Sequence, residues 1–405
     1  MYRAHLWRVV AGGLLLFLCG GAAPRGPILE LDPARERALA DHAGPDFSVK
    51  RTSHFLIAYD TSPEVVADLT NRLEQTYHMV FQFCSINGIE SRHPDRRLEV
   101  IFFDKRPDYE RYATRIGVTA DGTFGIYHQL TNRSFFFNAA NDEQVLKLQT
   151  QIVESNANID RIEKKLRSMP PNGTTIEIRF SDGERIVGTR AEIEKRVNRK
   201  LDEARADLKS IEARRRGYCD RINETVIQHE TAHQTLFNAG LHVRGASNPK
   251  WLIEGLACLF ETPPGPPGSG FSVLNAARLE DFRSAVGGQS KRRLTSRDYE
   301  RAVQAGLIAS PKELILKPDL IDLRGDSGLR NYAVAWAMAH YLQRNQRDQL
   351  AAYLLDISGR RPGDNPLPQQ ELDLFEEHFG PIDEIFLRKF SSYILGQTPR
   401  AQQDP

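Results

Sequence analysis

Cysteine is scarce in this 405-residue chain, which contains four. One of them, Cys19, lies in an apolar N-terminal segment, and the others are Cys84, Cys219 and Cys258. Because an odd number of thiols cannot all pair within one chain, the sequence offers no disulfide framework. We expect these three residues to be buried thiols.

An excess of charge of either sign is also missing. The chain has 54 basic and 53 acidic residues, so its formal net charge is +1. Overall electrostatics therefore give no argument for binding to nucleic acid or to an acidic membrane surface. The basic run 214–216 ends a predicted helix, where cations suit the helix dipole and the solvent. We predict no nucleic-acid partner.

A hydrophobic run at the N-terminus, residues 9–18, is too short for a comfortable membrane span of about 20 residues. Arg3 and Arg8 precede it and small residues follow it up to Ala23, which is the layout of a secretory signal peptide. We therefore expect residues 1–23 to be a signal peptide and the protein to be exported, as a periplasmic, secreted or envelope-associated protein. An uncleaved N-terminal membrane anchor is the alternative.

The rest of the composition is ordinary, with 40% hydrophobic and 26% charged residues, so the chain can bury a sizeable core. Its length exceeds the usual size of a single core, which favours several packed units. Residues 24–50 are rich in Pro, Gly, Ala and charge and lack periodicity, so they are predicted to form a flexible leader. Residues 398–405 are predicted to form a frayed tail.

Residues 51–142 show the pattern of a small α+β unit. Two buried strands are predicted at 54–59 and 98–103, each followed by a helix that starts near a proline, at Pro63 and Pro107. Two further apolar segments flank a turn-forming stretch and are predicted to be a hairpin or a pair of neighbouring strands, at 122–127 and 133–137.

Residues 143–217 change in character, because apolar side chains recur at steps of three and four between charges in two segments, 143–167 and 189–217. A compact hairpin is predicted between the segments, around the Asp182–Gly183 turn. The simplest model is a long antiparallel helical hairpin with a β tip, inserted into the body. It is either a solvated structural insertion or an arm for a partner in the cell envelope.

The next segment, residues 218–262, carries the main chemical motif. His229, Glu230 and His233 form an HExxH pattern within a stretch that lacks Pro and Gly. On a helix, residues four apart lie on one face, so both imidazoles can bind one metal ion while Glu230 reaches a water beside it. Apolar neighbours such as Ile227 and Phe237 predict a buried helix, where unsatisfied polar groups would be costly.

A second helix is predicted at 250–262, and Glu254 stands there among apolar residues such as Trp251 and Leu256. A carboxylate in such a helix is unexpected for a plain core and expected for the third ligand of a catalytic zinc, which often has two His, one Glu and a water. His242 is a competing ligand because it follows the motif closely. We prefer Glu254 because its own helix orients the side chain and because a carboxylate among apolar neighbours has no other explanation.

Glu254 follows His233 by 21 residues, and this arrangement resembles the gluzincin metallopeptidases, in particular the peptidase MA-like bacterial proteins. Within that group the chain is similar to an uncharacterised exported family that shares the second helix and a later helix beginning at Tyr332. The resemblance implies a small mixed sheet whose edge strand aligns an extended substrate above the zinc helix. It also implies a mainly helical C-terminal part, here 273–397 after a Pro/Gly loop at 263–272.

The resemblance implies roles for individual residues. Glu230 would be the general base that takes a proton from the water at the zinc and later passes it to the leaving amine. Tyr332 is the candidate donor to the oxyanion, or else a core tyrosine, and His340 and Tyr341 are weaker candidates. Where the thermolysin-like subgroup has a carboxylate one turn after the third ligand, this chain has Cys258, so an acid that orients a histidine ligand must come from elsewhere. Glu261 and Asp220 are candidates.

Three functional hypotheses follow. The first is an exported zinc peptidase that acts on peptides or on protein segments of the cell envelope. The second is a binding module that holds the same metal but is catalytically weak or inactive. In that case the metal stabilises the fold, and the helical hairpin binds a partner in the cell envelope. The third is a hydrolase of another amide, such as a peptidoglycan cross-bridge.

Overall fold

The computed structural model describes residues 29–120, 122–169, 175–179, 183, 185–262, 273–287, 292–322 and 325–398. The expected signal peptide (1–23), the Pro/Gly loop (263–272), the turn residue Asp182 and residues 399–405 of the expected tail lie outside these ranges. No helix within them is long and apolar enough to cross a membrane.

The fold is mixed α+β, as expected, and contains a small five-stranded mixed sheet. The strands are β1 (Ser48–Arg51), β2 (Phe55–Tyr59), β3 (Leu98–Phe103), β4 (Gly125–His128) and β5 (Arg133–Phe137). Their spatial order is β1-β2-β3-β5-β4, in which β2, β3 and β5 are parallel and the two edge strands are antiparallel to their neighbours. Among the described residues β4 pairs with β5 alone, so it is an edge strand.

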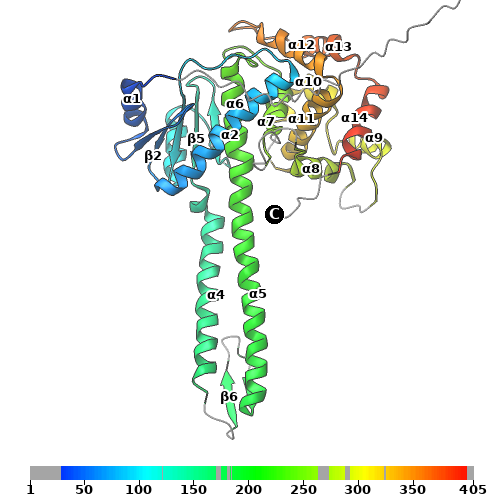
Figure 1. The fold of residues 1–405 in the computed structure, drawn as a ribbon. Coiled ribbons are helices and arrows are strands. Elements are labelled where there is room, and N and C mark those ends of the chain that lie inside the picture. The colour runs from blue at the N-terminus through cyan, green and yellow to red at the C-terminus, as the bar shows by residue number, and fades with distance from the viewer. Residues whose placement is uncertain are drawn as a thin grey trace, which may run out of the picture.

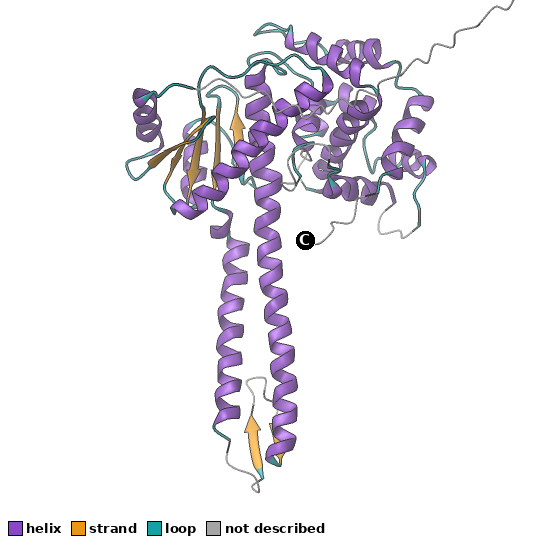
Figure 2. Cartoon of the chain, in the orientation of Figure 1, coloured by secondary structure: helices purple, strands orange, loops and turns teal. Residues whose placement is uncertain are grey.

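Helices cover both faces of this sheet (Figures 1 and 2). Side chains such as Ile101 and Phe135 pack on one face with α1 (Pro33–Ala43) and α3 (Arg106–Arg115). Side chains such as Val100 and Phe136 pack on the other face with α2 (Pro63–Asn87). Because both faces are buried, the central strands are continuous apolar runs, which is why the sequence predicts them well.

The structure corrects the prediction of a flexible leader at 24–50. Residues 33–43 form α1, whose N-cap Asp32 accepts a hydrogen bond from the Arg35 amide, and residues 48–51 form the edge strand β1. Leu39 is fully buried, and Arg35 also forms an ion pair with Glu99 of β3. A short helix with a single buried residue, next to a half-exposed edge strand, leaves no periodic pattern to detect.

The inserted helices α4 (Glu143–Arg167) and α5 (Arg190–Ile222) lie side by side and project from the body as a long arm (Figure 1). Two short strands, β6 (Ile176–Arg179) and β7 (Arg185–Gly188), pair at its far end. The arm has its own small apolar core, including Ile162, Val197 and Leu201. Its base is held by Asp142, which accepts hydrogen bonds from Tyr218 and Arg106 after the short turn η1 (Ala139–Asn141).

The second arm helix does not end before the predicted metal helix, although the sequence placed a boundary at 217/218. It continues through a π-helical turn, η2 (Asn223–Ile227), directly into α6 (Gln228–Ala239). The sequence predicted a further helix from Tyr218, but the backbone remains helical across that position. The arm and the HExxH motif therefore share one helical rod.

The C-terminal part is helical and packs beside α6 (Figure 1). Its elements are α7 (Lys250–Cys258), α8 (Ala276–Gly287), α9 (Ser296–Gln304), α10 (Pro311–Leu316), η4 (Pro318–Leu320), α11 (Asp326–Asn345), α12 (Arg347–Ser358), α13 (Pro368–Phe379) and α14 (Glu384–Gly396). The predicted helical stretch 371–395 is split between α13 and α14, because Pro381 cannot continue a helix.

Candidate metal centre

The helix α6 is attached to the sheet by a buried glutamine. Gln234 is fully buried, and its side-chain amide donates to the backbone carbonyls of Glu99 and Asn132 while its oxygen accepts from Ser134. A buried amide with all these partners fixes the rotation of its helix. The opposite end of the motif is held by Gln228, whose amide donates to the carbonyls of Phe260 and Thr262 after α7.

The edge strand β4 approaches the start of this helix closely at a glycine. A Cβ on Gly125 would lie 2.4 Å from a ring carbon of Phe136 and 2.9 Å from a methyl group of Val226 in the π-helical turn. Only a residue without a side chain fits between these neighbours. π-Helical turns inside α-helices are frequent at functional sites.

The helix α7 carries Glu254 and packs tightly on α11. A Cβ on Gly255 would lie 2.3 Å from the backbone oxygen of Ala335, so the two helices can approach to this distance only with glycine at position 255. Sequence reasoning quoted Gly255 only as part of the motif and missed this role. Its position directly after a buried carboxylate was the available signal.

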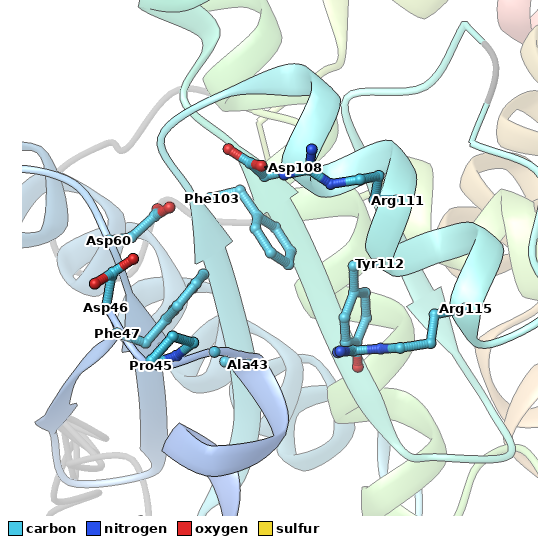
Figure 3. Close-up of a pocket in the computed structure, with 11 residues that line it drawn as sticks. Ala43, Pro45, Asp46, Phe47, Asp60, Phe103, Asp108, Arg111, Tyr112 and Arg115 are labelled. Carbon is cyan, nitrogen blue, oxygen red and sulfur yellow. Dashed lines mark ion pairs between the residues drawn. The ribbon is translucent and has the colours of Figure 1, made fainter.

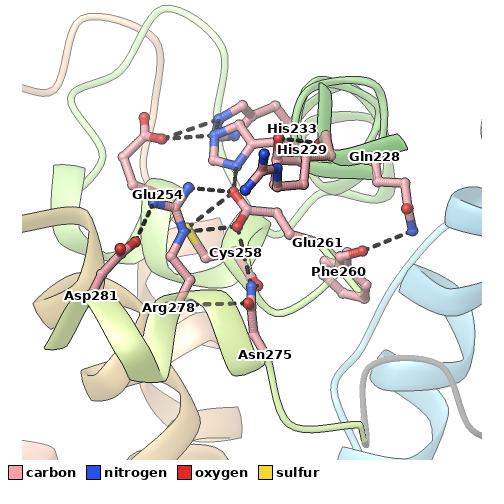
Figure 4. Close-up of polar contacts among 12 residues, drawn as sticks. Gln228, His229, His233, Glu254, Cys258, Phe260, Glu261, Asn275, Arg278 and Asp281 are labelled. Atoms are coloured by element: carbon pink, nitrogen blue, oxygen red, sulfur yellow. Dashed lines mark hydrogen bonds and ion pairs between the residues drawn. The ribbon is translucent and has the colours of Figure 1, made fainter. Parts of the chain in front are cut away.

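The three predicted ligands come together. The Nε2 atom of His229 lies 2.9 Å from Nε2 of His233 and 3.0 Å from Oε2 of Glu254, and the His233–Glu254 distance is 3.3 Å (Figure 4). Both histidines are only 7% exposed. We call these three residues the HExxH cluster.

This donor set fits zinc. With bonds of about 2.0–2.1 Å in a tetrahedral site, ligand atoms are separated by about 3.3 Å, and the three observed separations are close to that value. A single proton can serve one N–H···N or N–H···O bond, but it cannot satisfy three acceptors that converge on one point. A cation at that point would satisfy all three.

The electrostatics of the cluster also favour a cation. Burial opposes a charge on His229, but hydrogen bonds to Cys258, Glu254 and Glu261 outweigh it and hold its pKa well above the usual value. Burial likewise opposes the charge on Glu254, yet the neighbouring His233 and His229 hold its pKa well below the usual range. Positive charge is thus stabilised here, and a metal ion would compete with the proton for it.

Glu230 lies on the same helix and is partly buried. Its Oε2 atom accepts a 2.7 Å hydrogen bond from the backbone N–H of Tyr127 in β4. Burial raises the pKa of Glu230, and the negative charge of Glu254 adds to this, although His229 and His233 oppose it. A carboxylate with a raised pKa is better suited to accept and return a proton near neutral pH.

A second layer of side chains holds His229. Its Nδ1 atom lies 2.7 Å from Oε1 of Glu261, and Arg278 donates two hydrogen bonds of 2.8 Å to the Glu261 carboxylate (Figure 4). Asn275 donates a further bond to Glu261, and the Cys258 thiol lies 3.5 Å from it. Such partners orient a ligating imidazole and fix its tautomer.

Of the two predicted acids, Glu261 occupies this position and Asp220 does not. Asp220 is exposed on α5, before the π-helical turn. Sequence reasoning missed Arg278 and Asn275 altogether. Neither stands in a recognisable motif, and both reach Glu261 because the start of α8 lies beside the end of α7, where Asn275 also donates to the Cys258 carbonyl.

Tyr332 lies beside the cluster, with its ring centroid 6.1 Å from that of His229 and the Arg278 guanidinium over its face. The charge of Glu254 and burial hold its pKa well above the usual value, so the hydroxyl stays protonated. The weaker candidates pack elsewhere. His340 stacks on Trp336, and the Tyr341 ring meets rings of α14 such as Phe390.

His242, the competing ligand, is 2% exposed, and its ring lies 5.0 Å from that of Phe237. Burial lowers its pKa to about 3, with a further contribution from His233. Among the described residues neither of its ring nitrogens has a hydrogen-bond partner. It is a neighbour of the HExxH cluster, whereas Glu254 is the residue that meets both imidazoles.

A cavity of about 400 Å³ lies elsewhere, between the α1–β1 loop and α3 (Figure 3). Its walls include Asp60, Phe103, Tyr112 and Arg115, and burial raises the pKa of Asp60. It shares no residue with the HExxH cluster or with the second layer around Glu261. The candidate chemistry therefore lies outside this cavity.

The comparisons with known proteins cover part of the chain. A family model described as a protein of unknown function (DUF1570) matches residues 223–364. This range begins at the π-helical turn and contains both ligand helices, Arg278 and Tyr332, but not the sheet or the arm. No curated protein and no solved structure matches the chain.

Proposed function

We propose that this protein is a zinc-dependent metallohydrolase, and specifically a peptidase of the gluzincin type. The observation that carries the proposal is the convergence of His229, His233 and Glu254 within 3.3 Å of one another, beside a carboxylate, Glu230, held by an edge strand. This arrangement joins a fitting donor set to a positioned base.

When bound, zinc would supply Lewis-acid activation of a water molecule and of the scissile carbonyl. Glu230 accepts the proton of that water and returns it to the leaving amine. Its Oε2 atom is engaged by the Tyr127 amide, which leaves Oε1 for the proton transfer. Tyr332, kept protonated, donates to the developing oxyanion.

The open edge of the sheet supports an extended peptide as substrate. The Tyr127 N–H points away from β5 and toward α6, so the free side of β4 runs along the metal helix. An extended chain can add to such an edge through backbone hydrogen bonds. A peptide bond aligned in this way would pass over the HExxH cluster.

The test is the variant Glu230→Gln, with Glu143→Gln as the matched control. Glu143 is an exposed glutamate at the start of α4 and does not belong to the HExxH cluster or to the second layer around Glu261. Bound zinc is measured by mass spectrometry, and cleavage is followed in a mixed peptide library and a peptidoglycan cross-bridge peptide. We expect unchanged zinc in both variants and a loss of about 10²–10⁴-fold in cleavage for Glu230→Gln alone.

A wild-type protein that binds zinc but cleaves neither substrate set would contradict the peptidase proposal. Cleavage of the cross-bridge peptide alone would assign the same chemistry to another amide.

The second candidate function is a metal-stabilised binding module, favoured by the projecting arm of α4 and α5 (Figure 1). In that case the arm contacts a partner in the cell envelope, and Glu230→Gln leaves function intact. Replacing residues 147–213 by a short Gly/Ser linker distinguishes the peptidase from the binding module. A peptidase keeps its turnover of short peptides, whereas a binding module loses its partner.

We also propose export, on the basis of the signal-peptide pattern in residues 1–23. N-terminal sequencing of the protein recovered from the cell envelope or the medium tests this. A mature terminus near Ala23 is expected, while an intact Met1 in the membrane fraction would favour the anchor.

A further inference from the structure

A second group of imidazole and carboxylate side chains lies where β2 begins, against the middle of α2. Its members are His54, which directly precedes β2, and Glu74 and His78, which are four residues apart on α2. Residues at this spacing share one face of a helix, so both α2 side chains can face His54. We call these residues the α2 cluster. It shares no member with the HExxH cluster.

The two acceptor atoms of Glu74 are both held by His54. Oε2 lies 2.6 Å from Nδ1 of the ring, and Oε1 accepts a 2.9 Å hydrogen bond from the His54 backbone N–H. The carboxylate therefore has a fixed orientation. One potential ligand atom from each of His54, Glu74 and His78 lies within 4.8 Å of the other two.

Aromatic packing holds the His54 ring in place. It stacks on Tyr77 at a centroid distance of 3.8 Å, and the Tyr77 hydroxyl is bonded in turn to Nδ1 of His93. His54 is 7% exposed, whereas His78 is exposed and meets the His54 ring edge-on at 5.2 Å. One side of the cluster is thus rigid, and the other is open to an ion from solvent.

A simple ion pair does not explain the third member. His54 and Glu74 already satisfy one another, so nothing in their pairing requires an imidazole at position 78. Elsewhere on the surface, His378 pairs with Asp356 at 2.7 Å, and no third ligand group joins that pair among the described residues. Two imidazoles and one carboxylate whose ligand atoms lie this close together, with His78 exposed to solvent, form a donor set suited to zinc and its neighbours in the first transition row.

We propose that His54, Glu74 and His78 bind a second divalent transition-metal ion of the zinc type, independent of the HExxH cluster. The ion completes its coordination with water on the exposed side. It ties the start of β2 to α2, which in turn packs on the same core as α6. Its role is structural, because it joins two elements of the fold.

The experiment measures zinc binding to the full chain by calorimetry and by metal analysis after dialysis. His78→Ala and Glu74→Gln are the test variants, and His378→Ala is the control because it removes a histidine from a similar carboxylate pair. We expect each test variant to bind one ion fewer than the wild type, and His378→Ala to bind the same number. Cobalt substitution adds a readout, since each His₂–carboxylate cluster should give visible absorption bands and His78→Ala should remove the contribution of the α2 cluster alone.

A double variant, His229→Ala with His233→Ala, separates this proposal from the proposed function. It should keep one bound ion that is lost when His78→Ala is added, whatever the fate of the HExxH cluster. The proposal is overturned if His78→Ala and Glu74→Gln bind as many ions as the wild type with unchanged cobalt spectra. His78 is exposed, so its replacement leaves the fold intact, and circular dichroism checks this for every variant.

Discussion

The two histidine–carboxylate clusters differ in their burial and in their surroundings. In each cluster one helix supplies two of the three members, α6 in the HExxH cluster and α2 in the α2 cluster. Both histidines of the HExxH cluster are buried, and Glu261, itself paired with Arg278, holds the outer nitrogen of His229. In the α2 cluster His78 is exposed. Burial and a second layer of side chains, rather than the donor set alone, distinguish a site suited to catalysis from one suited to holding two elements together.

The largest effect is expected from breaking the HExxH cluster at its carboxylate. Glu254→Ala removes the ligand that meets both imidazoles, so the zinc affinity should fall by more than the roughly 10–100-fold typical of second-layer changes. Competition with a fluorescent chelator measures the affinity. The α2 cluster should keep its ion in this variant. If the wild-type protein bound zinc equally tightly at both clusters, burial and the second layer would not distinguish them.

A buried histidine that belongs to neither cluster sharpens the contrast. Burial lowers the pKa of His340 to about 4, helped by the charge of Arg344. Since the folded protein keeps this ring neutral, stability is complete above the unfolded pKa of about 6.5 and falls as the pH drops toward 4. The loss should reach at most about 3 kcal/mol.

Urea unfolding of the wild type and of His340→Phe at several pH values checks this expectation. The variant should lose less stability between pH 6.5 and pH 4 than the wild type. Identical slopes would mean that His340 is protonated in the folded state as easily as in the unfolded chain.

The close contact of α7 with α11 can be broken at a single position. Gly255→Ala places a methyl group against the Ala335 carbonyl, so the helices must move apart at a cost of about 1–3 kcal/mol. Gly217→Ala in α5 is the matched control, because a Cβ there meets nothing within 4 Å and alanine favours the helix. Thermal unfolding should show a decrease for the first variant and a small increase for the second.

The smallest effect is expected from the second layer. Glu261→Gln keeps the size of the side chain but weakens its hold on His229 and removes the closer of the two carboxylates that pair with Arg278, leaving Asp281. Zinc affinity at the HExxH cluster should fall by about 10–100-fold. An unchanged affinity would show that Glu261 does not support the metal ligand His229. Zinc binding at the α2 cluster serves as the internal control.

The fold could be predicted in segments where the pattern of apolar residues is long and regular. The central strands are uninterrupted apolar runs, and the arm helices repeat apolar residues at helical steps over more than twenty residues. The strands β2 and β3 and the helix α4 were therefore placed with nearly their observed bounds, and α5 was placed correctly except at its end. The segment 33–51 was not, because α1 buries little more than Leu39 and β1 is half exposed. The break between α13 and α14 was missed because the apolar period continues across Pro381.

The local part of the candidate site follows from the amino-acid sequence. The spacing of His229 and His233 dictates a shared helix face, and the isolation of Glu254 among apolar residues marks it as a partner for something charged. Only the tertiary structure decided that these helices meet, through Gly255 against α11 and Gln234 against the sheet. The tertiary structure also determines which acid holds His229 and how Glu230 contacts β4. These contacts join residues far apart in the chain, and the periodicity of a sequence describes single elements rather than contacts between them.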